Sequence, residues 1–218
     1  VLFVRPRDEE AERWIGARVG PDGAREVFGA DQVYDINEME KRLPHLLAGA
    51  DTVYFRLGSD PPVEDRVVEA LGTARRRGAR KGLGPRSIVD PGEILDSMRL
   101  VKDAEEVDRM RRAASVTVDA LHDLGSAIRP GVGEWELEAV LDSGFRMRGA
   151  WGPAYPTIVG SGPNACVLHY VSNERTVEEG DLVLVDAGAE LNLYAADITR
   201  TFPASGQFSD AQRSIYEV

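Results

Sequence analysis

Residues 180–203 read GDLVLVDAGAELNLYAADITRTFP and predict a β-hairpin. The apolar run Leu182–Val185 follows a Gly-Asp turn and is typical of a strand that is buried on both faces. A second strand is expected over Tyr194–Phe202, where β-branched and aromatic residues recur. Because the segment between them is short, we expect the two strands to pair in antiparallel fashion.

An aspartate stands on each strand of this hairpin. With the turn centred on Leu191 and Asn192, Asp186 and Asp197 are expected directly opposite one another, with Cβ atoms about 4.5–5.5 Å apart. Like charges that close destabilise a sheet, so the pattern indicates either a raised carboxylate pKa or a cation between the two side chains. A pair of divalent metal ions there favours hydrolysis through an activated water. The alternative is another register, with one aspartate in an ordinary turn; since Leu191 is an unusual turn residue, a bulge or a longer loop stays open.

A histidine lies in an apolar segment upstream of the hairpin. The segment Cys166–Val171 is expected to be a strand, with His169 on the same face as Val167 and Val171. An imidazole at such a position can donate a proton, ligate a metal or act as an electrophile. The alternative, which the apolar surroundings favour, is a histidine packed in the core.

Strands and helices alternate over the first ninety residues and predict an α/β domain. The expected elements are the strands 1–4, 32–34 and 52–55 and the helices 9–18, 36–47 and 63–77. The segment 82–86, followed by Asp90-Pro91-Gly92, is rich in glycine and proline and is the best candidate for a linker, so we place a domain boundary near residue 95. The domains are then 1–95 and 96–218, and the second is expected to open with two helices, 104–128 and 134–148.

Composition and charge narrow the class of protein. The chain is 43% apolar and 29% charged, which is typical of a globular protein and excludes collagen-like, low-complexity and disordered chains. Its net charge is −11, and residues 101–218 carry 10 basic against 19 acidic residues, which argues against a nucleic-acid partner. No apolar run is long enough to span a membrane and no leader is visible, so we expect a cytoplasmic protein; whether a leader precedes Val1 stays open.

Four ordered blocks of sequence resemble the Xaa-Pro aminopeptidases, a family of metallopeptidases related to prolidase. The blocks are TIVGSG at 157–162, NACVLHY at 164–170, GDLVLVDAG at 180–188 and ADITRTFP at 196–203. The resemblance implies a small α/β domain followed by an α+β catalytic domain of the pita-bread fold. It also implies release of the N-terminal residue from peptides with proline in second position.

The same resemblance implies roles for particular residues. Asp186 and Asp197 ligate a dinuclear centre of divalent ions, commonly Mn²⁺. His169 contacts the substrate near the scissile carbonyl and is the catalytic candidate of this chain. Tyr155 supports the metal-binding carboxylates and belongs to the substrate-binding side of the site. The family commonly forms dimers or tetramers, so a homo-oligomer is expected.

The family completes its metal site with a histidine and two glutamates from the second half of the catalytic domain. By resemblance, Val218 falls about halfway through that domain, so we expect a chain cut at both ends that binds metal poorly and is inactive alone. Two alternatives stay open: a prolidase, which cleaves only dipeptides, and a non-catalytic module of the same fold that binds peptides. A metal-free creatinase-like hydrolase is disfavoured because Asp186 and Asp197 are both present.

Overall fold

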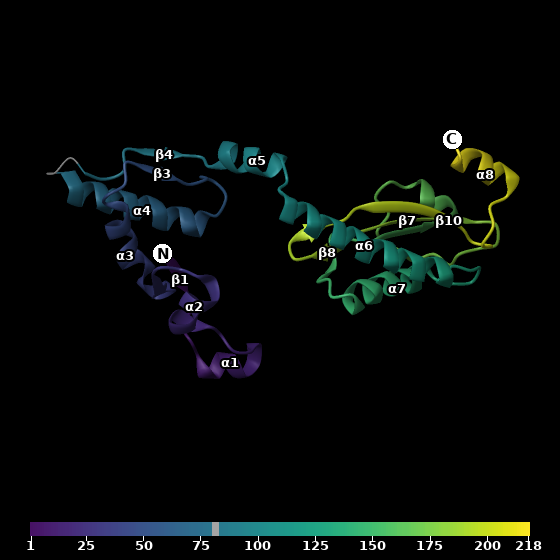
Figure 1. Ribbon diagram of the computed structural model, residues 1–218, viewed down its shortest axis with the longest axis horizontal. Coiled ribbons are helices and arrows are strands. Elements are labelled where there is room, and N and C mark those ends of the chain that lie inside the picture. The colour runs from purple at the N-terminus through teal and green to yellow at the C-terminus, as the bar shows by residue number, and fades with distance from the viewer. Residues whose placement is uncertain (80–82) are drawn as a thin grey trace. The chain divides into compact units, whose positions relative to one another are not determined.

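The computed structural model describes residues 1–79 and 83–218, which form two compact units, Val1–Leu100 and Val101–Val218. Figure 1 shows the elements of each unit, and we describe each unit by itself. The predicted boundary near residue 95 lies inside helix α5 (Gly92–Leu100). Of the predicted linker, Gly82 lies outside the described residues, and strand β4 (Ser87–Val89) lies between its two parts.

The first unit contains two pairs of parallel strands. Strand β1 (Leu2–Val4) pairs with β2 (Val33–Asp35), and β3 (Thr52–Tyr54) pairs with β4. Parallel strands cannot be joined by a tight turn, so helices connect the members of each pair. Helices α1 (Glu9–Ile15) and α2 (Gly20–Phe28) lie between β1 and β2, and α4 (Pro61–Gly78) lies between β3 and β4. Helix α3 (Met39–Leu47), preceded by a 3₁₀ turn η1 (Ile36–Glu38), leads from β2 to β3, and α5 follows β4. The α/β character predicted for this part of the chain is confirmed.

Helix α2 was not predicted from the sequence. It begins with Gly20 and Pro21 and contains Gly23, and these residue types are typical of turns. Pro21 is nevertheless compatible with a first helical turn, where its missing N–H costs nothing. Burial of Ala24 shows that tertiary packing holds this helix in spite of its poor intrinsic propensity.

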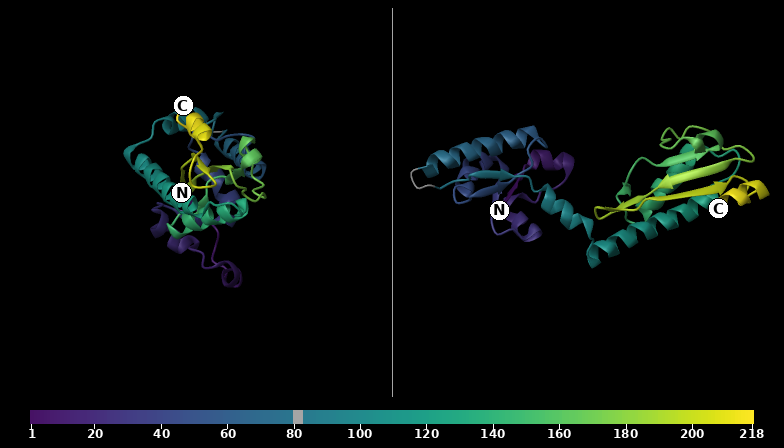
Figure 2. Two further views of the ribbon diagram at one scale, coloured as in Figure 1. Left: turned by 90° about the vertical axis from the view of Figure 1, so that its right-hand side faces the viewer. Right: turned by 90° about the horizontal axis from the view of Figure 1, so that it is seen from above.

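The second unit is built from two long helices and antiparallel strands. Helices α6 (Ala104–Ala127) and α7 (Glu134–Met147) pack on each other and on the strands, and α6 runs along one side of the sheet in Figures 1 and 2. One sheet has the order β10-β7-β6 and the other the order β5-β8-β9. The strands are β5 (Gly152–Pro153), β6 (Ile158–Ser161), β7 (Leu182–Ala187), β8 (Ala189–Leu191), β9 (Tyr194–Ala195) and β10 (Ile198–Pro203), followed by α8 (Asp210–Tyr216). Among the described residues, none of the helices has the length and apolar character needed to cross a bilayer.

Burial alternates along β7, so the prediction of a strand buried on both faces was wrong. Val183, Val185 and Ala187 are fully buried and belong to the core that α6 and α7 cover, whereas Leu182, Leu184 and Asp186 are half-buried. This pattern is that of an antiparallel sheet with helices on one face. Asp186 consequently lies on the face of the sheet that is turned away from the helix-packed core.

Candidate metal site

The predicted register of the hairpin was wrong by two residues. Asp186 pairs with Thr199 rather than with Asp197. The turn consists of Asn192 and Leu193, not of Leu191 and Asn192, and both turn residues have positive φ, 51° and 69°. Such a two-residue turn with φ above zero at both positions matches the twist of a hairpin. Sequence reasoning missed it because leucine rarely adopts this backbone conformation.

A slip of two residues keeps every side chain on its original face, because side chains alternate with a period of two. Asp197 precedes Thr199 by two positions, so Asp186 and Asp197 are diagonal neighbours on one face instead of direct partners. The two aspartates are therefore close to each other, and one hydrogen-bond donor, the Tyr155 hydroxyl, contacts both. The Tyr155 hydroxyl lies 2.6 Å from Oδ1 of Asp186 and 3.2 Å from Oδ1 of Asp197.

The Tyr155 hydroxyl is held in its protonated form. Burial and the hydrogen bond to Asp186 raise the pKa of Tyr155 well above its ordinary value, and the charge of Asp197 acts in the same direction. A phenol that keeps its proton can donate to a carboxylate over the whole ordinary pH range. The three side chains therefore form one hydrogen-bonded cluster in which a single donor faces two carboxylates.

The segment before Tyr155 runs along β8 and carries the phenol to the carboxylates. Trp151 N donates to Glu190 O at 2.8 Å, and Ala154 N donates to Gly188 O at 2.8 Å. Residue 188 must be glycine here, because a Cβ atom would lie 1.7 Å from Ala196 O. Since the obstacle is backbone, no rotamer change relieves it. The Gly188 position thus brings β8 close to the segment that carries Asp197.

Two side-chain hydrogen bonds attach the hairpin to α6. The Ala189 N–H donates to Oγ1 of Thr117 at 2.9 Å, and the Tyr194 hydroxyl donates to Oε1 of Glu106 at 2.7 Å. Thr117 is fully buried, so its bond is protected from water. The rigid helix consequently fixes the hairpin on both sides of its turn, close to the residues that carry the carboxylate cluster.

Tyr155 and Asp197 open onto a hollow of about 640 Å³. The rest of its wall is mainly apolar and comes from α6 and from β9 and β10; it is formed by Val107, Met110, Arg111, Ala114, Ala154, Ala195, Ala196 and Ile198. Apolar walls with a few polar groups are typical of sites that bind organic ligands. The hollow thus places an apolar wall beside the carboxylate of Asp197.

His169 is not on a strand, so that prediction was wrong. The segment is a 3₁₀ helix, η3 (Gly162–Cys166), followed by a turn that contains His169. His169 is exposed, as are its neighbours Val167 and Leu168, and the alternative of a core histidine is therefore also wrong. Among the described residues, it makes no hydrogen bond to Tyr155 or to either aspartate.

Two buried polar residues near His169 were missed in the sequence. Glu134, the first residue of α7, is 0% exposed, and Asn173 is 1% exposed. Asn173 has φ 47°, a conformation that asparagine tolerates better than most residues, so its type was a weak signal. Glu134 carries no local signal, because the partners of its carboxylate are 27 to 41 residues away in sequence.

The donor set fits a hard divalent cation only in part. Asp186 and Asp197 offer carboxylate oxygens, which suit Mn²⁺, Mg²⁺ and Ca²⁺. Within residues 1–79 and 83–218, however, no group of three or more His, Cys, Asp or Glu side chains is arranged to hold a metal ion. The two carboxylates by themselves therefore do not form a complete metal site.

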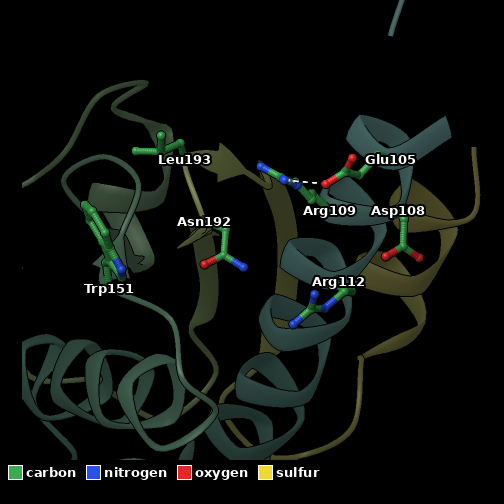
Figure 3. A pocket seen from close by; sticks show the side chains of 7 residues that line it. All are labelled: Glu105, Asp108, Arg109, Arg112, Trp151, Asn192 and Leu193. Carbon is green, nitrogen blue, oxygen red and sulfur yellow. Dashed lines mark hydrogen bonds and ion pairs between the residues drawn. The ribbon is translucent and has the colours of Figure 1, made fainter. Parts of the chain in front are cut away.

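A second hollow, of about 480 Å³, lies between the start of α6 and the hairpin turn (Figure 3). Arg112, Trp151 and Asn192 contribute to its wall, and Arg109 forms an ion pair with Glu105 at its edge. None of the four predicted site residues lines it. We therefore keep the cluster around Tyr155 as the candidate site.

Comparison with known proteins identifies the family. Residues 108–218 match metallopeptidase family M24, and residues 1–54 match the N-terminal domain of aminopeptidase P. The Xaa-Pro aminopeptidase of Escherichia coli K12 is 43% identical over an alignment of 219 positions that covers 100% of this chain and 49% of that protein. Human Xaa-Pro aminopeptidase 3 is 32% identical, again over 100% of this chain but 42% of its own length.

Solved structures similar to this chain belong to the same family. The structure of Pseudomonas aeruginosa aminopeptidase PepP has a TM-score of 0.93 and 44% identity, covering 99% of this chain and 49% of that chain. A zinc-substituted E. coli aminopeptidase P in complex with product also has a TM-score of 0.93, at 43% identity and with the same coverage. The fold of the chain is thus that of the aminopeptidase P structures.

The chain belongs to the aminopeptidase P group of metallopeptidase family M24. It contains an aminopeptidase P N-terminal domain and part of a pita-bread domain, which confirms the predicted fold class. The chain spans about half the length of the curated relatives that it matches.

Proposed function

We propose that this protein is a metal-dependent Xaa-Pro aminopeptidase, which releases the N-terminal residue from peptides with proline in second position. The observation that supports this most is the cluster of Asp186, Asp197 and the Tyr155 hydroxyl, with distances of 2.6 and 3.2 Å from the phenol to the two carboxylates. A single hydroxyl donor cannot satisfy all the oxygen atoms of two carboxylates, so oxygen atoms of both aspartates are available to bind a cation. Relatives with the corresponding name and 43% or 35% identity support the substrate class.

Each of the four candidate site residues has a role in this proposal. Asp186 and Asp197 hold divalent ions, and Tyr155 orients both carboxylates through its hydroxyl. When bound, such ions polarise the scissile carbonyl and activate a water. The exposed imidazole of His169 contacts the substrate near that carbonyl and donates a hydrogen bond to the oxygen on which negative charge develops.

The finer features of the proposal rest on the family resemblance. We propose Mn²⁺ as the physiological ion, two ions per site, a homodimer or homotetramer, and a cytoplasmic enzyme. We also propose that the domain boundary lies near residue 95, so that residues 96–218 are the part that carries the site. The oxygen donors of Asp186 and Asp197 are compatible with Mn²⁺.

An assay of the full-length protein tests the proposal. Xaa-Pro-Yaa tripeptides, Xaa-Pro dipeptides and Xaa-Ala-Yaa tripeptides are compared with Mn²⁺ and with a chelator. We expect cleavage of the Xaa-Pro-Yaa tripeptides that the chelator abolishes, and little cleavage of the alanine series. Cleavage of dipeptides alone indicates a prolidase, and peptide binding without cleavage indicates a non-catalytic module.

Two matched variants connect the activity to the cluster. Asp197→Asn keeps the size of the side chain but removes its charge, and we expect it to abolish metal-dependent cleavage. Asp210→Asn makes the same change on an exposed aspartate of α8 and should leave the activity unchanged. An active Asp197→Asn protein would show that the carboxylate cluster is not the site.

A further inference from the structure

The loop that carries His169 is held at both ends by buried polar side chains. We call residues 162–175 the His169 loop. Its middle is exposed: Leu168 is 83% exposed and Val171 is 52% exposed. Exposed apolar side chains contribute little to holding a loop in one conformation. The position of His169 therefore depends on the anchors that flank it.

Glu134 is the first anchor, and its carboxylate accepts five hydrogen bonds from both flanks of the loop. Oε1 accepts from the Ser161 N–H and the Ser161 hydroxyl, each at 2.7 Å, and from Nδ2 of Asn164 at 3.4 Å. Oε2 accepts from the Tyr170 hydroxyl at 2.8 Å and from the Arg175 N–H at 2.9 Å. One carboxylate thus joins the entry and the exit of the loop.

The charge of Glu134 is maintained despite its burial. Burial alone raises the pKa of Glu134, but the hydrogen bonds from Arg175, Ser161 and Tyr170 outweigh it, and the pKa lies below its ordinary value. An ionised carboxylate offers acceptor sites only, which is what five donors require. A glutamine cannot replace it fully, because its amide nitrogen would face donors on one of the two sides.

Asn173 is the second anchor and acts on strand β6. Its Oδ1 accepts from Val159 N at 2.9 Å, and its Nδ2 donates to Thr157 O at 2.8 Å. The side chain thus satisfies the free edge of β6 as a neighbouring strand would. The residue between these two contacts, Ile158, pairs with Asp186 on the other side of the strand.

Together these contacts connect the loop to the candidate metal ligands. Asn173 binds the backbone on both sides of Ile158, and Ile158 is the partner of Asp186 in the sheet. Glu134 binds Ser161, the last residue of the same strand. Neither anchor contacts Asp186 or Asp197 directly, so neither is a metal ligand.

We propose that Glu134 and Asn173 are positioning residues that set the His169 loop in register with Asp186, and so place the imidazole for its reaction. This inference rests on the proposed function, because it assigns the purpose of the anchors to His169. In this proposal Glu134 is not a catalytic residue, and its role is more than a general contribution to stability. Its effect on the reaction is transmitted through the position of His169.

The test is a double-mutant cycle in the full-length protein with Glu134→Gln and His169→Ala, assayed on an Xaa-Pro-Yaa tripeptide with saturating Mn²⁺. Since misplacement by about 1 Å can cost about a hundredfold, we expect Glu134→Gln to lower kcat by about that factor with little change in KM. In the His169→Ala background the same substitution should lower kcat by less than about threefold, because the group that it misplaces is absent. Equal losses in both backgrounds would overturn the proposal.

A second readout does not depend on activity. Amide hydrogen exchange at Ser161 and Arg175, whose N–H groups donate to Glu134, should be at least about tenfold faster in Glu134→Gln than in the wild type. Glu138→Gln, one turn further along α7 and partly exposed, is the matched control and should change neither kcat nor the exchange. Unchanged exchange in Glu134→Gln would overturn the proposal.

A milder variant covers the case in which Glu134→Gln does not fold. Tyr170→Phe removes one of the five hydrogen bonds and keeps the ring, so we expect a smaller loss of kcat that again disappears in the His169→Ala background. A wild-type protein that cleaves no Xaa-Pro peptide would refute the proposed function, whereas the exchange experiment would still decide whether Glu134 holds the loop.

Discussion

Tyr155 holds the two candidate metal ligands through a single proton. A hydroxyl can donate its hydrogen fully to one acceptor only, and the shorter distance, 2.6 Å, is to Asp186. Asp197 at 3.2 Å receives the weaker share and is also the more exposed carboxylate. The two carboxylates thus differ in how closely Tyr155 holds them, and the longer contact is the one to Asp197.

Replacing Tyr155 with phenylalanine tests this role. We expect Tyr155→Phe to weaken Mn²⁺ binding by the full-length protein by about 10–100-fold, because the carboxylates lose the donor that orients them. Calorimetric titration with Mn²⁺ measures the change. The control is Tyr54→Phe, which makes the same substitution at an exposed site in the first unit. An unchanged affinity in Tyr155→Phe would contradict the orienting role.

Glu134 predicts a specific dependence of stability on pH. Its pKa is lower in the folded protein than the ordinary value of 4.5, so its contribution is present above that pH and is lost as the pH falls through the lowered pKa. At pH 7 we expect Glu134→Gln to lower the free energy of unfolding by about 1–3 kcal/mol. Below pH 4.5 the difference between the two proteins should shrink, since the protonated acid resembles the amide.

Urea denaturation of both proteins at several pH values measures this difference. Other carboxylates titrate in both proteins, so their contributions cancel when the two free energies are subtracted. A difference that stays constant on acidification would indicate that the substitution acts through packing and not through the charge of Glu134.

At the scale of elements, the hairpin turn stores backbone strain. Leu193 has φ 69° and is 75% exposed, so it occupies a left-handed conformation without gaining much from burial. The adjacent Asn192, with φ 51°, suits the same turn much better. The register that brings Asp186 and Asp197 together is therefore set by the surrounding contacts, among them the bond from Ala189 to Thr117.

Glycine at position 193 should relieve this strain. We expect Leu193→Gly to raise the free energy of unfolding by about 1 kcal/mol, since the left-handed conformation costs a leucine about 1–2 kcal/mol and glycine adds some entropy to the unfolded chain. Leu193→Ala removes the same side chain but keeps the Cβ atom, so it should bring no comparable gain. A loss of stability in Leu193→Gly, measured by urea denaturation, would show that the exposed leucine has a packing role.

Over the whole molecule, helices with regular apolar spacing and capping residues could be predicted from the sequence. Conformations that depend on residues far away in the sequence could not. Helices α6 and α7 lie close to their predicted bounds, because their apolar spacing is regular. The pairing partner of Asp186 could not be predicted, because it depends on positive φ angles at Asn192 and Leu193, and leucine rarely adopts such an angle. The family resemblance gave the four candidate site residues, but the sequence could not show that Tyr155 connects the two aspartates or that His169 is exposed.

The anchors of the His169 loop were unpredictable for a related reason. Glu134 reads as an ordinary acidic residue in the first turn of a helix, where acidic side chains are common. Its burial results from donors that arrive from β6 and from the end of the loop. Such a residue becomes recognisable only when the tertiary structure assembles its partners.

The number of ligands in the described residues predicts how these 218 residues behave with metal. Asp186 and Asp197 alone are two oxygen-donor side chains, whereas a stable site needs about four or more ligands. We expect the 218-residue chain to bind Mn²⁺ at least about a thousandfold more weakly than the full-length protein, since complete structural metal sites gain about 10–16 kcal/mol on binding and two carboxylates supply only part of such a ligand set. Calorimetric titration of both proteins measures the ratio. Tight Mn²⁺ binding by the 218-residue chain that survives Asp197→Asn would show that the ion binds elsewhere and that the carboxylate cluster is not its site.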